Sequence, residues 1–113
     1  MEYQDIILEQ QGAITMITLN RPASLNALTP LMIRELKTAL KDIASDSNCK
    51  VLILKGAGRA FSAGVDLKAM NESLVGGQFT SYEIIQEGND IACILRTMPQ
   101  PAIVQVHGHC YTG

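Results

Sequence analysis

The feature that most constrains the fold is an uninterrupted apolar run at residues 51–54, with the sequence Val-Leu-Ile-Leu. A strand with one face in water alternates apolar and polar side chains, whereas a strand covered on both faces of a parallel sheet does not. The run follows a segment whose apolar residues recur at helical spacing, and it precedes a glycine-rich segment. A helix, a buried parallel strand and a loop in this order predict an α/β fold.

The rest of the chain extends this pattern on both sides. The expected elements are strands at 3–9 and 13–19, a helix at 30–44, the strand at 51–54, helices at 66–74 and 80–97, and a strand at 102–106. The turn Gln11-Gly12 predicts a hairpin between the first two strands. Thr29 followed by Pro30 is typical of a helix start. In the helix at 80–97, the side chains expected to face the core are Ile84, Ile85, Ile91, Ala92, Ile94 and Leu95.

Composition excludes several classes of protein. The 113 residues are 47% hydrophobic and 18% charged, which fits one folded domain and not a disordered chain. A net charge of −2 without a basic block argues against nucleic acid as a partner, and no apolar run is long enough for a membrane span. The acidic N-terminus does not resemble a signal peptide, and the three cysteines form no C-x-x-C pair. We therefore expect a reducing, cytoplasmic location.

Two loops that follow apolar strands, at 56–66 and 107–113, are the candidate site. Ligands in α/β proteins bind where strands end, and the first loop holds three glycines and leads into a helix. The loop at 56–66 either binds an anion or a developing oxyanion, or only turns the chain. The glycine spacing fits neither a dinucleotide loop nor a P-loop. The cluster His107, His109 and Cys110 has no finger-like partner, so no metal is expected. Ser62 lies in the same loop without an evident histidine partner.

Three stretches resemble the enoyl-CoA hydratase/isomerase (crotonase) family of fatty acid metabolism. They are Ile-Thr-Leu-Asn-Arg-Pro at 17–22 followed by Leu-Asn-Ala-Leu at 25–28, the run 51–56 leading into Ala-Phe-Ser-Ala-Gly-Val-Asp-Leu-Lys at 60–68, and Gln-Pro-Ala-Ile-Val-Gln-Val-His-Gly at 100–108. The resemblance implies the ClpP/crotonase fold, a spiral of ββα units. It further implies that residues 1–113 form the N-terminal portion of one such domain, truncated before its C-terminal part.

The resemblance also implies a site for an acyl-CoA thioester. Two backbone N–H groups, those of Val65 and Gly113, would form the oxyanion hole that stabilises a thioester enolate. The substrate-binding positions implied are Ala23, Ser24, Leu25, Ala63, Val65, Asp66, Leu67, Lys68 and Gly113. Valine at 65 and threonine at 112 depart from the family's usual alanine and glycine. Asp66 is expected either as a helix cap or as a ligand residue. Coenzyme A is part of the substrate, so no separate cofactor is expected.

The implied activity is the hydration of a 2-enoyl-CoA, with double-bond isomerisation and non-catalytic acyl-CoA binding as alternatives. The family's acid/base glutamates lie beyond its second oxyanion glycine. Glu72, Glu83 and Glu87 do not fall on those positions. The chain alone is therefore expected to be inactive. A further alternative is that the chain is a truncation product with no stable fold. The full-length protein is expected to form homotrimers or hexamers.

Overall fold

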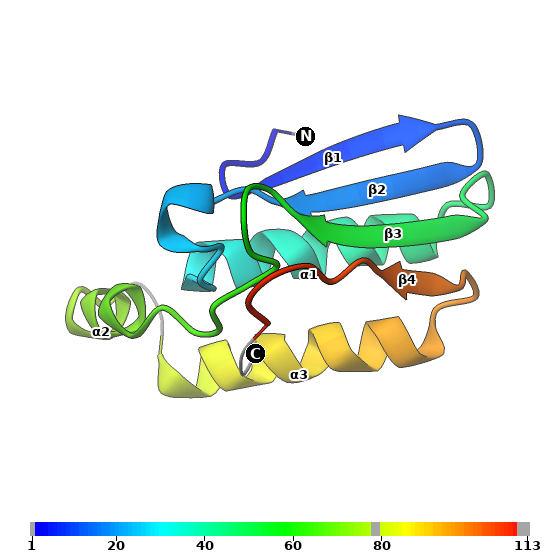
Figure 1. Cartoon of the computed structure of the whole chain (residues 1–113). Helices are drawn as coiled ribbons and strands as arrows, with labels where there is room; N and C mark the ends of the chain where they lie inside the picture. Colours follow the sequence, from blue (N-terminus) through cyan, green and yellow to red (C-terminus); the bar gives the residue numbers. More distant parts are fainter. Residues whose placement is uncertain (1, 78–79, 111–113) are drawn as a thin grey trace.

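The computed structural model describes residues 2–77 and 80–110. Its four-stranded sheet has the order β1-β2-β3-β4, where β1 is Ile6–Gln11, β2 is Ile14–Leu19, β3 is Val51–Gly56 and β4 is Ala102–Val104 (Figure 1). The first two strands are antiparallel and form the predicted hairpin around Gly12, while β3 and β4 add in parallel. The parallel position of β3 confirms the α/β prediction made from residues 51–54.

Three helices accompany the sheet, and each begins where its cap predicts. They are α1 at Pro30–Ala44, α2 at Leu67–Val75 and α3 at Ser81–Thr97, with a short 3-10 turn, η1, at Pro22–Ser24. The side chain of Thr29 accepts a hydrogen bond from the Met32 N–H at 3.0 Å, which caps α1. Asp66 and Thr80 cap α2 and α3 in the same way.

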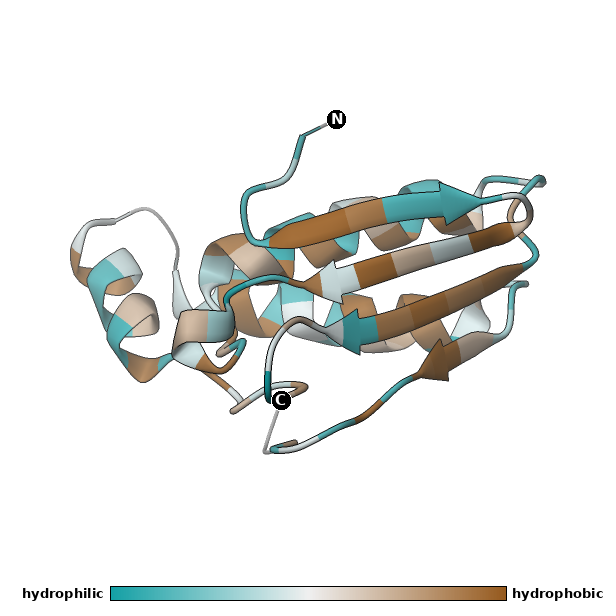
Figure 2. Ribbon diagram, turned by 45° about the horizontal axis from the view of Figure 1, so that its top comes forward, coloured by the Kyte–Doolittle hydropathy of each residue, from teal (hydrophilic) through white to brown (hydrophobic). Residues whose placement is uncertain are grey.

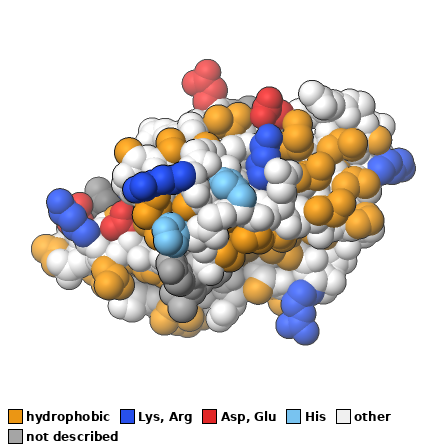
Figure 3. Space-filling model, viewed as in Figure 1, with side chains coloured by type: hydrophobic (Ala, Val, Ile, Leu, Met, Phe, Trp, Pro, Cys, Tyr) orange, Lys and Arg blue, Asp and Glu red, His pale blue; other side chains and the backbone are white. Residues whose placement is uncertain are grey.

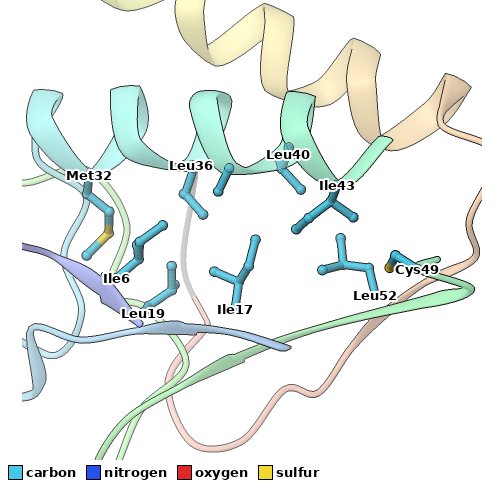
Figure 4. Packing of buried hydrophobic residues seen from close by; sticks show 10 residues of the cluster. Ile6, Ile17, Leu19, Met32, Leu36, Leu40, Ile43, Cys49 and Leu52 are labelled. Atoms are coloured by element: carbon cyan, nitrogen blue, oxygen red, sulfur yellow. The ribbon is translucent and has the colours of Figure 1, made fainter. Parts of the chain in front are cut away.

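The core lies between α1 and one face of the sheet (Figure 4). Its buried members are Ile6, Ile17, Leu19, Met32, Leu36, Ala39, Leu40, Ile43, Cys49 and Leu52. Helix α3 packs beside α1, where Arg34 pairs with Glu87 at 2.6 Å and Lys37 with Asp90 at 2.8 Å. Because α2 lies beyond the end of the sheet, it adds only Met70 to the buried apolar residues (Figure 1).

The sequence predictions about burial are wrong for part of α3 and for residues 51–54. Ile85 and Ala92 of α3 do not face the core but are exposed, Ile85 by 64%, because α3 has a packing partner on one side only. The strand at 51–54 is covered on one face and not on both: Leu52 is fully buried, while its neighbours Val51 and Ile53 are half-buried. The apolar run indicated the parallel neighbours correctly but not the coverage.

The second face of the sheet carries an apolar surface. The strand register places Ile7, Ile14, Met16, Ile53 and Ile103 on this face. Figure 2 shows apolar bands across all strands, and Figure 3 shows hydrophobic side chains gathered over them. Strand β4 is exposed along its whole length, although its apolar sequence Ala-Ile-Val indicates a buried strand. Among the described helices, none is long and apolar enough to cross a membrane.

Candidate functional site

The loops that follow β3 and β4 lie side by side at the carboxyl end of the sheet (Figure 1). The Phe61 N–H donates to the carbonyl oxygens of His107 and His109, at 2.8 and 3.1 Å, and Ser62 pairs with Cys110 in a parallel bridge. The ring of His107 lies 2.7 Å from the Gly58 carbonyl oxygen. The structure thus brings the described parts of the two candidate loops together.

A third segment, residues 25–28, runs along the other side of the first loop. The Ala63 N–H donates to the Leu25 carbonyl at 2.9 Å, the Leu28 N–H to the Gly64 carbonyl at 2.7 Å, and the Asp66 N–H to the Leu28 carbonyl at 2.9 Å. Residues 62–66 therefore lie between two other segments, with hydrogen bonds on both sides.

The backbone of Val65 points away from residues 25–28. In a parallel pair of segments, a residue bonds to the two residues on either side of the one opposite it. Leu28 bonds in this way to Gly64 and Asp66. Val65 lies between these two, so its own N–H and C=O point away from residues 25–28. Within residues 2–77 and 80–110 the Val65 N–H donates no hydrogen bond. The side chain of Val65 is 43% exposed. Val65 thus offers a free backbone donor beside the start of α2.

The carboxylate of Asp66 is committed to the protein. One oxygen accepts from the Ala69 N–H at 3.0 Å, which caps α2, and the other lies 3.2 Å from the Arg21 guanidinium. The bond from Ala69, followed by the Arg21 contact, lowers the pKa of Asp66 below its ordinary value, although partial burial opposes this. The structure therefore confirms the helix-cap interpretation of Asp66.

The remaining predicted site residues lie in η1, in the loop before Val65 and at the start of α2, with one exception. Ala23 and Ser24 lie exposed in η1, and Leu25 follows them in the left-handed conformation with φ 53°. Ala63 contacts Leu25 through its N–H. Leu67 and Lys68 are exposed in the first turn of α2. Gly113 and Thr112 lie outside the described residues.

Sequence reasoning did not identify Asn26 as a site residue. It is fully buried with a positive φ of 55°, and its side chain bonds to three backbone groups of the surrounding loops. Asparagine tolerates this left-handed conformation better than most residues, which is the signal that the motif Leu-Asn-Ala-Leu contained. Among the described residues, no group of three His, Cys, Asp or Glu side chains gathers to hold a metal ion.

A free backbone N–H beside a helix start, at the carboxyl end of the parallel strands of the sheet, is an arrangement that favours negative charge on a ligand. The fold and these loops therefore define an α/β protein with a candidate anion site. Comparison with known proteins makes the class specific.

Residues 14–113 match the family model described as Enoyl-CoA hydratase/isomerase. The chain is 36% identical over 108 residues to a mitochondrial 3-hydroxyisobutyryl-CoA hydrolase of Rattus norvegicus, covering 95% of this chain and 28% of the rat protein. It is 34% identical over 116 residues to the short-chain-enoyl-CoA hydratase of Clostridium acetobutylicum, covering 100% of this chain and 42% of that protein. The chain thus spans less than half the length of these relatives.

The fold is similar to that of an enoyl-CoA hydratase/isomerase from Xanthobacter autotrophicus Py2. The two agree with a TM-score of 0.82 and 34% sequence identity, covering 96% of this chain and 40% of that one. The chain belongs to the enoyl-CoA hydratase/isomerase family, and its α/β structure is part of the crotonase fold.

Proposed function

We propose that the whole protein binds an acyl-CoA thioester and stabilises an enolate on the thioester oxygen, with the Val65 N–H as one of two oxyanion donors. The observation that carries the proposal is the direction of this N–H, which points away from residues 25–28 and has no acceptor among the described residues. A preorganised donor of this kind needs no rearrangement when charge develops on the oxygen. The start of α2 adds its favourable dipole.

The second donor in this proposal is the Gly113 N–H. The bridge between Ser62 and Cys110 shows that the two loops run in parallel. Gly113 follows Cys110 by as many residues as Val65 follows Ser62. Both donors would then come from adjacent parallel segments, which is a simple way to direct two N–H groups at one oxygen atom.

Hydration of a 2-enoyl-CoA is the reaction that we propose for this site. Water adds its oxygen to C3 while the electron pair of the double bond moves onto the thioester oxygen, and a proton then returns to C2. The donors lower the energy of the charged oxygen, whereas a general base and a general acid move the protons. The carboxylates of Glu83 and Glu87 are paired with Arg34 on α1, and we place the acid and base outside this segment.

The proposed substrate contacts follow the residues around Val65. The backbone of η1 and Leu25 would lie along the pantetheine arm, and Ala63 would lie near the adenine. Asp66, Leu67 and Lys68 would border the acyl group. Asp66 would do so without a hydrogen bond of its own, because its carboxylate, its N–H and its C=O all have partners within the protein. Association into trimers or hexamers is part of the proposal for the whole protein.

Thioester hydrolysis is a second candidate, favoured by the 36% identity to the rat 3-hydroxyisobutyryl-CoA hydrolase. The same two donors would stabilise the tetrahedral oxyanion that water forms at the thioester carbon. Double-bond isomerisation and binding without catalysis are the remaining alternatives.

The test supplies the full-length protein with crotonyl-CoA and, separately, with a saturated acyl-CoA. Loss of the enoyl thioester absorbance without thiol release supports hydration, and release of the CoA thiol supports hydrolysis. Rearrangement between 2-enoyl and 3-enoyl products supports isomerisation. Binding without any of these products would make the protein a binder, and failure to bind either thioester would overturn the proposal.

A further inference from the structure

Ser62 lies within the candidate site, but its hydroxyl is fully engaged. The residue is buried, with 5% of its surface exposed. Its Oγ donates to the Asn26 carbonyl oxygen at 2.9 Å and accepts from the Gly64 N–H at 3.1 Å. A hydroxyl that bridges two backbone groups in this way is placed to hold a loop and not to attack a substrate.

Asn26 fixes the other end of this bridge. Its Nδ2 donates to the carbonyl oxygens of Ala57 and Ala60, at 2.8 and 2.9 Å, and its Oδ1 accepts from the Arg21 N–H at 2.7 Å. These bonds join the loop after β3 to the loop after β2. The Asn26 side chain is fully buried, and its bond to the Ala60 carbonyl is shielded from water.

The peptide group between Gly64 and Val65 connects this network to the oxyanion donor. A peptide group is planar and trans, so its N–H points opposite to its C=O. The Gly64 carbonyl is held by the Leu28 N–H at 2.7 Å, and the Val65 N–H must therefore point outward. Gly64 has φ 94°, a conformation that glycine adopts easily, and a glycine also allows this peptide to rotate.

We propose that Ser62 and Asn26 are positioning residues that fix the orientation of the peptide group between Gly64 and Val65. Ser62 holds the N–H of Gly64, Leu28 holds its C=O, and Asn26 holds Ser62 through its own carbonyl. Loss of the Ser62 hydroxyl frees one end of Gly64, and the peptide group gains other orientations in which the Val65 N–H no longer points at the substrate oxygen. This inference rests on the proposed oxyanion role of Val65.

The test measures the carbonyl stretch of a butyryl-CoA labelled with ¹³C at the thioester carbon, bound to the full-length protein. Hydrogen bonds to the carbonyl oxygen lower this frequency. We expect Ser62→Ala to lose much of the lowering while the dissociation constant changes little, and Ser62→Thr, which keeps the hydroxyl, to restore it. With crotonyl-CoA, kcat should fall by about 10²-fold in Ser62→Ala with a small change in KM.

Thr18→Val is the matched control, because it also removes a buried hydroxyl but from β2, where the oxygen has no hydrogen-bond partner among the described residues. It should leave the carbonyl frequency unchanged. An unshifted frequency in the unsubstituted protein would overturn the proposed function and this inference together. A lowered frequency that survives in Ser62→Ala would overturn the positioning role alone.

A second measurement needs no substitution and remains informative if Ser62→Ala fails to fold. In native-state hydrogen exchange of the unsubstituted protein, the Gly64 and Leu28 amides should exchange slowly because both are hydrogen bonded, while the ligand-free Val65 amide should exchange faster. A Gly64 amide that exchanges as fast as an exposed loop amide would contradict the inference.

Discussion

The guanidinium of Arg21 lies 3.2 Å from the carboxylate of Asp66, and the same nitrogen donates to the Ala27 carbonyl oxygen at 2.6 Å. Arg21 thereby links the loop before α1 to the N-cap residue of α2. Val65 directly precedes Asp66 and pairs with Leu28 of the same loop before α1. The ion pair and the cap at Asp66 therefore stabilise the two chain segments from which the proposed donor emerges.

Asp66→Asn should lose stability at neutral pH but not at low pH. Asparagine still caps a helix, so the substitution mainly removes the charge that faces Arg21. Because the folded protein lowers the pKa of Asp66, its contribution is present above the unfolded pKa and disappears as the pH falls through the folded pKa. The difference in free energy of unfolding between the two proteins should be up to about 1 kcal/mol at pH 7 and should close at acid pH.

Urea unfolding of both proteins across the acid range measures this difference. Asp66→Ala serves as the comparison, because it also removes the cap and should cost about 1 kcal/mol more. A difference that stays constant down to the lowest pH would mean that the Asp66 charge does not contribute.

Two glycines with nearly the same backbone conformation should respond differently to alanine. Gly12 has φ 59° and Gly108 has φ 61°, so both substitutions force alanine into the left-handed region, at a cost of about 1–2 kcal/mol. A Cβ at Gly12 meets nothing within 4 Å, whereas a Cβ at Gly108 overlaps the Arg59 carbonyl oxygen. Gly108→Ala should therefore destabilise the protein clearly more than Gly12→Ala, as thermal unfolding can measure. Equal losses would show that the contact between the two loops yields without cost.

Local chemistry made the element starts predictable from the sequence. Thr29, Asp66 and Thr80 each cap the helix that follows them, because a short polar side chain satisfies a free N–H wherever the helix happens to lie. The parallel strand at 51–54 was predictable for a similar reason, since a helix on one side and a loop on the other leave few topologies.

Long-range relations were not predictable in the same way. Helical periodicity identified the apolar residues of α3, yet Ile85 is exposed because the pattern does not reveal what covers each side of a helix. The direction of the Val65 N–H depends on bonds to Leu28, which is far away in the sequence. The role of Asn26 depends on two loops at once, because its side chain bonds to Arg21 in one and to Ala57 and Ala60 in the other. Only the folded chain brings these groups together.

The exposed strand β4 should make the 113-residue chain associate in solution. The side chains of Ile103 and Val104 are 53% and 47% exposed, and no charged residue interrupts residues 101–106. Such an edge is prone to pair with other chains.

Ile103→Lys should shift the elution of the chain in sizing chromatography towards the monomer. Glu83→Lys, a charge change on the surface of α3, should have no such effect. A compact monomer at high concentration without any substitution would contradict the expectation.

Glu35 should be needed to hold the start of the chain on α1. Its carboxylate accepts from the Gln4 and Asp5 N–H groups, at 2.7 and 2.8 Å, and the residue is buried. Glu35→Ala leaves both groups without an acceptor, which should cost about 1–3 kcal/mol. Faster hydrogen exchange at Gln4 and Asp5 would accompany the loss. Glu83→Ala is the control, because Glu83 pairs with Arg34 and not with the start of the chain. It should leave the exchange rates of the Gln4 and Asp5 amides unchanged.

Val65 in the full-length protein offers the most direct test of the proposed site. Val65→Ala keeps the backbone N–H and only widens the pocket, so turnover should change little or rise with bulkier acyl groups. Val65→Pro removes the N–H, and because this N–H bonds to nothing within the described residues, the substitution should break no hydrogen bond among them. Loss of one oxyanion donor should lower kcat by about 10²–10³-fold.

Thermal unfolding and a CoA titration must first show that Val65→Pro folds and binds. With that established, binding of the ground-state thioester should weaken far less than turnover, because the donor matters most when the oxygen is fully charged. A folded Val65→Pro protein with near-normal turnover would show that Val65 is not an oxyanion donor.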